Sequence, residues 1–597
     1  MGADLASSPR LPVLAALLLS LLTVALYPRL GRSVRAGACR VAALLPARWT
    51  RDGSLDAPLW RFTAASLLLA AFALVTVTSG DYGYNVDEGP QRRLGAAIVD
   101  WYARSLSQRE YRQFDMEIVA INHYGGFFEV FAEFAARISP LDHTSTRHLI
   151  TAWFGVLGLL GVYLLGCTLH SRATGSLTLL LLLLTPRFYG HFFSNSKDLP
   201  FAVVTVFALL AICRCLPLLP RLTPTRIAIV GGAIGAVMGI RVAGVITLVF
   251  FALTLAWWLG GEILSTRERD ARLQPRDLLA LIGSGLGVAC VAWLMMLVFW
   301  PWAQSAPLLR PVQALGYFRD IVAQLGIDFP VFFEGRDYRL STVPRYFTLE
   351  FLLISAPEIA VLAPLVGSAL LGQLRNPRLA WPSSRNMAWI VVGASIVLPL
   401  ATTTSRGIIQ YDGIRHFLFV IPSMALVLSG SLVAILAGPV ASRFKAGFVV
   451  AMISLSAITV WDMRQLHPYQ YVYFNRSIAG GLGRAARFYE TDFLGLSYRE
   501  GVRWVLANYR PQVSRQIRIV GCRGFEENVV DGLATDPANA RRFRPVHAHS
   551  RPDIAVALTR VHCRDKFPGR VLNRVKRQGV PLLYVIELGD RKRWLGR

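Results

Sequence analysis

Residues 199–219 read LPFAVVTVFALLAICRCLPLL, an uninterrupted apolar run with one charged side chain, Arg214. An α-helix rises about 1.5 Å per residue, so a run of this length crosses the roughly 30 Å hydrocarbon core of a bilayer. Of the 597 residues, 54% are hydrophobic and 17% charged, whereas soluble domains carry about 25% charged residues. This composition excludes soluble multidomain enzymes, fibrous proteins and disordered chains. It predicts a polytopic membrane protein.

Comparable runs recur along most of the chain and predict eleven transmembrane helices. A further apolar segment at 11–27 is followed by Pro28 and Arg29 instead of a small-residue cleavage site, so we interpret it as an uncleaved extra helix. The predicted fold is therefore an all-α membrane protein of about 11–12 transmembrane helices. The eleven runs lie at 62–79, 149–169, 174–190, 199–219, 227–240, 243–261, 277–300, 351–371, 387–404, 414–436 and 446–461.

The distribution of arginine predicts which side of the membrane each loop faces. The segment 28–61 holds seven arginines, whereas the loop 80–148 holds ten acidic residues against seven arginines. Short loops rich in Lys and Arg stay in the cytoplasm. Alternation through eleven spans then places one set of loops inside and the other outside. The expected division is 1–61 (extra helix and basic cytoplasmic segment), 62–461 (transmembrane domain with outer loops 80–148 and 301–350) and 462–597 (outer domain).

The tail 462–597 has no run of membrane length. It carries 25 Lys and Arg against 12 Asp and Glu, and short β-like runs alternate with a helical pattern, which predicts a small basic α/β domain outside the cytoplasm. The charge favours solubility and attraction to anionic headgroups, and a dock for an anionic partner is the alternative. Cys522 and Cys563 are its only cysteines. A disulfide and two buried free thiols are both compatible with their positions.

The first candidate site is the stretch DYGYNVDEG at 81–89, directly after the first span. Adjacent carboxylates such as Asp87 and Glu88 repel one another at a membrane surface, so one of them gains a raised pKa or needs a cation. Either property suits a general base or a metal ligand. The alternative is a solvated helix start, because acidic residues are favoured in a first turn.

The second candidate site is TPRFYGHFFSNSKDLP at 185–200, which joins two apolar runs. A simple connection between helices needs turn residues and not three potential cations. Arg187, His191 and Lys197 are placed to neutralise a phosphate at the interface, and Asp198 is a candidate ligand for a metal or a sugar hydroxyl. Side chains that reach from the apolar region to the headgroups as anchors are the alternative.

Two further ionisable positions interrupt apolar sequence. Arg241 lies between two spans, and YDGIRH at 411–416 places Arg415 and His416 at the start of another. Ionisable residues at such depths are rare unless they pair or serve function, and a shared outer side makes one anion site a reasonable hypothesis. The chain contains no phosphate-binding loop, nucleophile elbow, HExxH or dinucleotide fingerprint. No nucleic-acid partner is expected.

These stretches resemble the polytopic type-C glycosyltransferases that use polyprenyl-phosphate sugars. Three further stretches share the resemblance: WPW at 300–302, HPYQYVYFN at 467–475 and YETD at 489–492. The likeness is to the bacterial family 39-like branch, in the superfamily of protein O-mannosyltransferases and lipid A aminoarabinose transferases. The matching stretches lie between about residues 80 and 500. They follow one another in the family's order, and all are expected on the same side of the membrane. The resemblance implies an inverting transfer, outside the bacterial inner membrane, from a lipid-phosphate sugar to an acceptor hydroxyl on a glycolipid, glycan or protein. A protein acceptor is doubtful, because the extra lumenal domain of the protein O-mannosyltransferases is absent.

The resemblance also implies roles for individual residues. Asp87 or Glu88 is the expected base, and the second loop is where family members meet the donor phosphate or, in some, a divalent metal. A transporter or flippase of a lipid-linked saccharide is the main alternative function, and a catalytically silent assembly partner is a third. The expected donor-binding residues are Arg187, His191, Lys197, Asp198, Arg241, Arg415 and His416.

Overall fold

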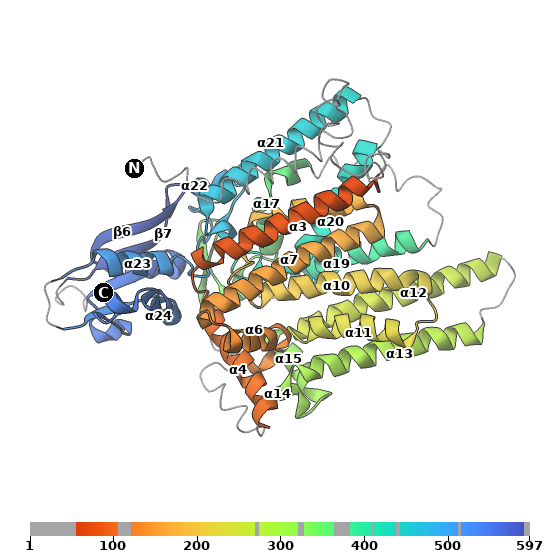
Figure 1. Cartoon of the computed structure of the whole chain (residues 1–597), viewed down its shortest axis with the longest axis horizontal. Coiled ribbons are helices and arrows are strands. Elements are labelled where there is room, and N and C mark those ends of the chain that lie inside the picture. Colours follow the sequence, from red (N-terminus) through yellow and green to blue (C-terminus); the bar gives the residue numbers. More distant parts are fainter. Residues whose placement is uncertain are drawn as a thin grey trace.

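The long helices run alongside one another as a bundle, and a small mixed domain lies at one end of it (Figure 1). The computed structural model describes residues 55–105, 121–268, 274–319, 328–362, 383–406, 410–437, 442–511 and 515–589. Eight helices within these residues are long and apolar enough to cross a membrane, which confirms the expected multi-pass helical fold. They contain α3 (Pro58–Thr78), α7 (His143–Leu169), α10 (Asp198–Cys215), α12 (Ile246–Glu268), α13 (Pro275–Val298), α19 (Ser384–Arg406), α20 (Ile421–Ala437) and α21 (Ser442–Leu466).

Three of the expected spans differ from simple membrane helices. The run 174–190 forms α8 (Arg172–Leu183) and the short α9 (Pro186–Gly190), with Thr185 extended between them at φ −90° and ψ 101°. The break follows from Pro186, because a proline disfavours helical backbone at the residue before it. The run 227–240 forms α11 (Pro224–Met238), whose 15 residues reach only about 22 Å.

The third exception is the run 351–371. Its described part contains α17 (Phe347–Ile354) and the 3₁₀ helix η7 (Glu358–Leu362). Its remaining residues, and the expected N-terminal helix at 11–27, lie outside the described residues.

Small residues let the short helix α11 approach α13 closely. A Cβ added at Gly231 would lie 2.7 Å from Cβ of Val291, and one at Gly235 would lie 2.5 Å from the carbonyl oxygen of Ala292. Glycines four residues apart on one helix face are a common device for helix contact in membranes, where apolar surface alone does not drive association. The short α11 is therefore held within the bundle, and its end places Arg241 near the other candidate residues.

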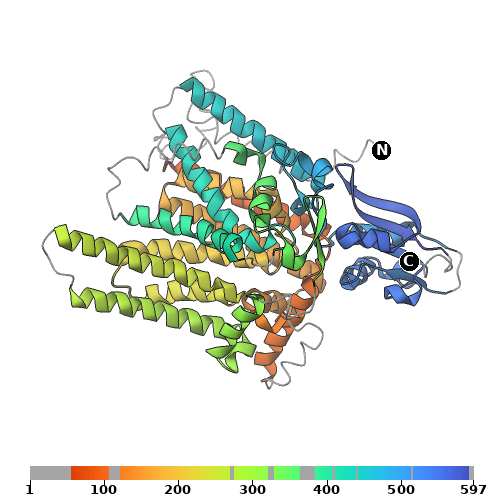
Figure 2. The ribbon, with the colours of Figure 1, turned by 180° about the vertical axis from the view of Figure 1, so that it is seen from behind.

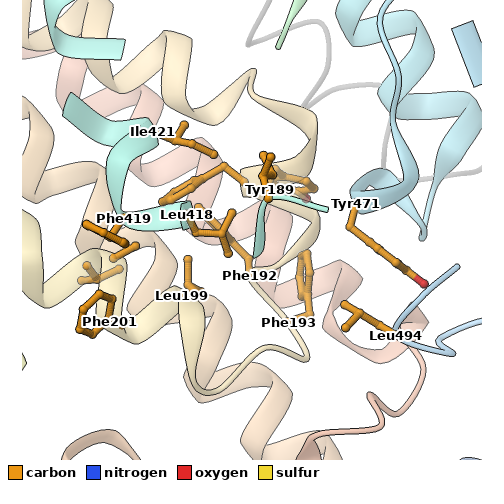
Figure 3. Packing of buried hydrophobic residues seen from close by; sticks show 14 of the residues in the cluster. Tyr189, Phe192, Phe193, Leu199, Phe201, Leu418, Phe419, Ile421, Tyr471 and Leu494 are labelled. Atoms are coloured by element: carbon orange, nitrogen blue, oxygen red, sulfur yellow. The ribbon is translucent and has the colours of Figure 1, made fainter. Parts of the chain in front are cut away.

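The helix α10 lies at the centre of the bundle, in contact with α7 and α11. Its first turn packs into an aromatic cluster in which the Phe201 and Phe419 rings meet edge to face, with centroids 5.2 Å apart. Figure 3 shows these rings together with Phe192, Phe193 and Leu418. This cluster fixes the two chain segments that carry Lys197 and Arg415.

Several connections at one end of the bundle contain their own short elements. Both views place the mixed domain at this same end (Figures 1 and 2). The connecting elements are α4 (Glu88–Arg104), α6 (Phe127–Ile138), α14 (Pro301–Gln304), α15 (Leu309–Arg319), β1 (Pro330–Phe333), β2 (Arg336–Arg339), the 3₁₀ helix η8 (Arg415–Val420) and α22 (Gly481–Ala485).

The mixed domain is built on a five-stranded sheet with the order β4-β3-β5-β7-β6. The strand β3 is parallel to β4 and β5, whereas β7 is antiparallel to β5 and β6. The predicted α/β character of the tail is thereby confirmed. Its elements are α23 (Tyr498–Asn508), β3 (Ile517–Val520), α24 (Glu526–Ala534), α25 (Pro537–Ala540), β4 (Phe543–Pro545), β5 (Ile554–Leu558), η11 (Arg560–Lys566), β6 (Arg570–Arg577) and β7 (Val580–Glu587).

Cys522 and Cys563 form a disulfide, with their Cα atoms 5.9 Å apart. The bond resolves the two alternatives that the sequence left open. It joins the end of β3 to the irregular helix η11 and closes a loop of 41 residues. A loop of this length is expected to stabilise the domain by about 2–4 kcal/mol.

Thiol labelling of the unfolded protein tests this bond. Of the seven cysteines in the chain, we expect five to react without reductant and all seven after reduction. Mass mapping should assign the two protected thiols to Cys522 and Cys563. Modification of both residues before reduction would contradict the disulfide.

Candidate active site

Four separate chain segments meet at the end of the bundle that faces the α/β domain. Asp87 lies at the N-terminus of α4, Lys197 at that of α10, and Arg415 at the start of η8. Arg241 lies between α11 and the segment that leads into α12. The structure thus brings together residues that are up to 328 positions apart in sequence.

Asp87, Lys197 and Arg415 form one ion-pair group, here called the Asp87 cluster. Oδ2 of Asp87 lies 3.1 Å from Nζ of Lys197 and also contacts Nη1 of Arg415. The side chain of Asp87 is 28% exposed, whereas that of Arg415 is 4% exposed. Solvent reaches this carboxylate, and the two cations that pair with it are suited to bind an anionic ligand at this point.

The two cations control the protonation of Asp87. Burial alone would raise the pKa of this carboxyl, but Arg415 and Lys197 lower it far below its ordinary value. Asp87 is therefore ionised at neutral pH. An ionised carboxylate can accept a proton, but it is a weak base while both cations remain on it.

Glu88 has different surroundings, although it is the next residue. Its side chain is buried, and Oε1 accepts a hydrogen bond from the backbone N–H of Asn85 at 2.8 Å. Nε2 of His148 lies 3.0 Å from the same oxygen. Glu88 thus joins the loop before α4 to α7, and Asp87 alone of the two expected candidates contacts the cations.

Replacing Glu88 by Gln should lower stability more than turnover. The amide cannot accept the same charge-assisted contact from His148, so we expect a loss of about 1–3 kcal/mol. Thermal unfolding of purified protein measures this loss. A Glu88→Gln variant that unfolds like the native protein but is inactive would return Glu88 to the position of candidate base.

Asp198 is held by a second buried pair beside the Asp87 cluster. Its carboxylate contacts Nη2 of Arg241, and Oδ2 accepts a hydrogen bond from the amide of Asn195 at 3.1 Å. Nδ1 of His191 accepts another amide hydrogen bond from Asn195 at 3.0 Å. Burial lowers the pKa of His191 to about 3, so this residue offers a neutral imidazole and not a cation.

The metal role expected for Asp198 stays a prediction. Among the described residues, no group of three or more His, Cys, Asp or Glu side chains is arranged to hold a metal ion. The Asp198 carboxylate instead faces a guanidinium, and like charge on a metal would compete with it.

Arg187 and His416 lie close to these loops without joining the ion pairs. Arg187 is buried, donates from Nε to the carbonyl of Tyr473 at 2.9 Å, and has its guanidinium 4.6 Å from the Phe474 ring centre. The ring of His416 packs edge to face on Tyr411. Of the seven expected donor-binding residues, Lys197 and Arg415 contact Asp87 directly.

Two serines beside Lys197 were not predicted. The hydroxyl oxygens of Ser194 and Ser196 are buried and have no hydrogen-bond partner among the residues that the structure describes. Buried polar groups normally have partners, so each such hydroxyl calls for an explanation. Both serines flank Asn195 in the stretch 185–200. Their closeness to Lys197 in the sequence was the signal that could have identified them.

A charged chain links the Asp87 cluster to the α/β domain. Oδ2 of Asp412 lies 2.8 Å from Nη2 of Arg415, and Oδ1 lies 2.5 Å from Nη2 of Arg560. Asp412 has a φ of 56°, in the left-handed region that residues other than glycine adopt rarely and mostly at functional or tightly held positions. Arg560 could not be singled out from the sequence, because it is one arginine among many in a basic tail.

No family model and no curated protein matches the sequence. Among solved structures, the chain is similar to the archaeal oligosaccharyltransferase AglB from Archaeoglobus fulgidus, in complex with an inhibitory peptide and a dolichol-phosphate. The identity is 14%, the TM-score 0.46, and the match covers 83% of this chain and 69% of that one.

A second similar structure is ArnT from Cupriavidus metallidurans bound to undecaprenyl phosphate. Here the identity is again 14%, the TM-score is 0.42, and the match covers 88% of this chain and 99% of that one. Neither likeness assigns a role to a residue of this chain.

Proposed function

We propose that the protein is a membrane glycosyltransferase that moves a sugar from a polyprenyl-phosphate donor to an acceptor hydroxyl. The observation that carries this proposal is the Asp87 cluster, in which a part-exposed carboxylate lies against Lys197 and Arg415. Transfer from a phosphate ester needs a base for the acceptor and cations for the leaving group. The cluster provides a base, Asp87, in direct contact with two cations, Lys197 and Arg415. It lies at the end of the bundle where a lipid headgroup would lie.

The proposed reaction is a single displacement. The acceptor hydroxyl gives its proton to the Asp87 carboxylate, and the acceptor oxygen forms a bond to the anomeric carbon. The bond from that carbon to the phosphate oxygen breaks, and its electron pair leaves with the polyprenyl phosphate. Lys197 and Arg415 stabilise the added negative charge, which is electrostatic catalysis. One displacement inverts the configuration of the anomeric carbon.

The pKa of Asp87 makes donor binding a condition for this reaction. With both cations on its carboxylate, the pKa lies far below its ordinary value, and such a group removes a hydroxyl proton poorly. A donor phosphate attracts the same two cations. As they turn toward the phosphate, the pKa of Asp87 rises and the carboxylate becomes a better base.

The alternative of a transporter or flippase has less support. Secondary transporters bind their substrates near the middle of the membrane, between repeated halves with broken helices. The Asp87 cluster lies instead at the ends of α4, α10 and η8. This position favours chemistry on a lipid headgroup over passage of a saccharide through the bundle.

The donor class and the location of the protein are part of the same proposal. The AglB and ArnT structures each hold a polyprenyl-type lipid phosphate, and we propose the same ligand class here, with a glycolipid, glycan or protein as acceptor. The arginine-rich segment 28–61 favours a cytoplasmic start. The Asp87 cluster and the domain 462–597 would then lie outside the plasma membrane of a bacterium.

Incubation of the purified protein with a panel of polyprenyl-phosphate sugars tests this function. We expect release of polyprenyl phosphate from at least one donor once a suitable acceptor extract is added. An Asp87→Asn preparation serves as the control for contaminating activity. Transport of intact donor between leaflets, without release of polyprenyl phosphate, would favour the flippase alternative.

A further inference from the structure

The α/β domain inserts one side chain into the charged end of the bundle. Arg560 begins η11, and its side chain is 11% exposed. Nη1 donates a hydrogen bond to the carbonyl of Phe493 at 2.6 Å, and Nη2 pairs with Oδ1 of Asp412. Nε lies 3.9 Å from Oε2 of Glu490. This fork of contacts fixes the guanidinium in one orientation.

Asp412 lies between two guanidinium groups and connects them. Its side chain is 1% exposed, with one oxygen on Arg560 and the other on Arg415. Buried pairs of this kind hold their geometry only while each charge keeps its partner. If Arg560 were absent, Asp412 would face Arg415 alone, and its second oxygen would lose its partner. The position of Arg415 would change, and with it the contact to Asp87.

The segment that carries Arg560 is anchored on both sides. Cys563, three residues after Arg560, is tied to Cys522 by the disulfide. Nε2 of His562 lies 2.8 Å from Oδ2 of Asp337 in β2. Val561 and His562 both have positive φ angles, of 53° and 50°. This left-handed backbone conformation is uncommon for valine and histidine, and it persists where contacts with the surrounding structure hold it in place.

We propose that Arg560 is a positioning residue which, through Asp412, holds Arg415 in the orientation that receives the donor phosphate. The inference rests on the proposed glycosyltransferase function for the meaning of the Arg415 site. It adds that the end of the bundle is a complete binding site only with the α/β domain docked on it. A displacement of about 1 Å in such a group can lower a rate by roughly 10²-fold.

Binding of polyprenyl phosphate, measured on the full-length protein by native mass spectrometry or calorimetry, tests the proposal without turnover. We expect Arg560→Gln to weaken binding about 10-fold or more. Asp412→Asn should weaken it similarly, and the double variant should bind no more weakly than either single variant. Arg560→Lys should recover part of the affinity, because a positive charge still faces Asp412.

Arg577 offers a matched control at the same interface. It also belongs to the α/β domain, and its Nε donates to the carbonyl of His467 at 2.9 Å. Among the described residues, it contacts none of Arg415, Asp412 and Arg560. Arg577→Gln should bind polyprenyl phosphate like the native protein. Native-like binding by Arg560→Gln, equal loss in Arg577→Gln, additive losses in the double variant, or no recovery with lysine would each overturn the proposal.

The same measurement separates this proposal from the proposed function. A native protein that binds polyprenyl phosphate but transfers no sugar would contradict the glycosyltransferase function, while the Arg560 comparison would still be decided by affinity. A native protein that fails to bind polyprenyl phosphate would overturn both. Transfer with native donor KM in the Arg560→Gln variant would contradict the positioning role alone.

Discussion

Replacement of Asp87 by Asn should reduce sugar transfer by about 10²–10⁴-fold, the usual contribution of a general base. The amide has nearly the same shape as the carboxylate but cannot accept the acceptor proton. The quantity to measure is kcat with a saturating polyprenyl-phosphate sugar. Because the change also removes a competitor for Lys197 and Arg415, donor affinity should stay equal or increase.

The control for this prediction is the unfolding temperature of the same variant. It should fall moderately because Lys197 loses its charged partner, but the variant should stay folded at the assay temperature. Equal turnover in Asp87→Asn and the native protein would remove Asp87 from the mechanism. A large fall in donor affinity with unchanged kcat would make Asp87 a binding residue and not a base.

Replacement of Lys197 by Gln is the second large effect that we expect. A hydrogen bond to a charged group contributes roughly 1.5–3 kcal/mol, so donor KM and the Kd for polyprenyl phosphate should rise by about 10- to 100-fold. Arg415→Lys should have an effect of the same direction. A lysine keeps the charge, but it cannot contact both Asp87 and Asp412 as the guanidinium does.

Arg214 provides the control for these substitutions, because it lies near the other end of α10 from Lys197. Arg214→Gln should bind polyprenyl phosphate with native affinity. If Lys197→Gln also bound it with native affinity, Lys197 would be an interfacial anchor, as the alternative interpretation of the sequence had it.

The membrane helices could be predicted from sequence because lipid imposes a strong requirement. A spanning segment must satisfy its backbone internally and present an apolar surface, so α10 and α13 are evident as long apolar runs. The same rule does not set the length of every helix. Pro186 interrupts the helix in the run that contains α8 and α9. The glycines of α11 allow a helix too short for a full span to be held by its neighbours.

The tail shows what periodicity detects and what it misses. The predicted β-like runs, at Ile517–Val520, Ile554–Leu558 and Leu582–Glu587, correspond to β3, β5 and β7, whose residues are mostly buried. The strand β6, RVLNRVKR, was not predicted, because it lies at the sheet edge and only one of its eight residues is buried. An edge strand has one paired side, so its sequence needs little apolar character.

The candidate site was predicted in its residue types but not in its connections. The loops that contain Asp87, Lys197 and Arg415 were identified because charged residues interrupt apolar sequence. The different surroundings of Asp87 and Glu88 depend on the first turn of α4, which directs adjacent side chains to different partners. Arg560 had no signal in sequence, because only the fold brings it to Asp412.

The most direct test of the central claim is a cryo-EM map of the protein with polyprenyl phosphate bound. We predict density for the phosphate in contact with Nζ of Lys197 and the guanidinium of Arg415, with Asp87 released from at least one of the two cations. A phosphate bound elsewhere, with the Asp87 cluster intact beside it, would contradict the proposed site and the mechanism derived from it.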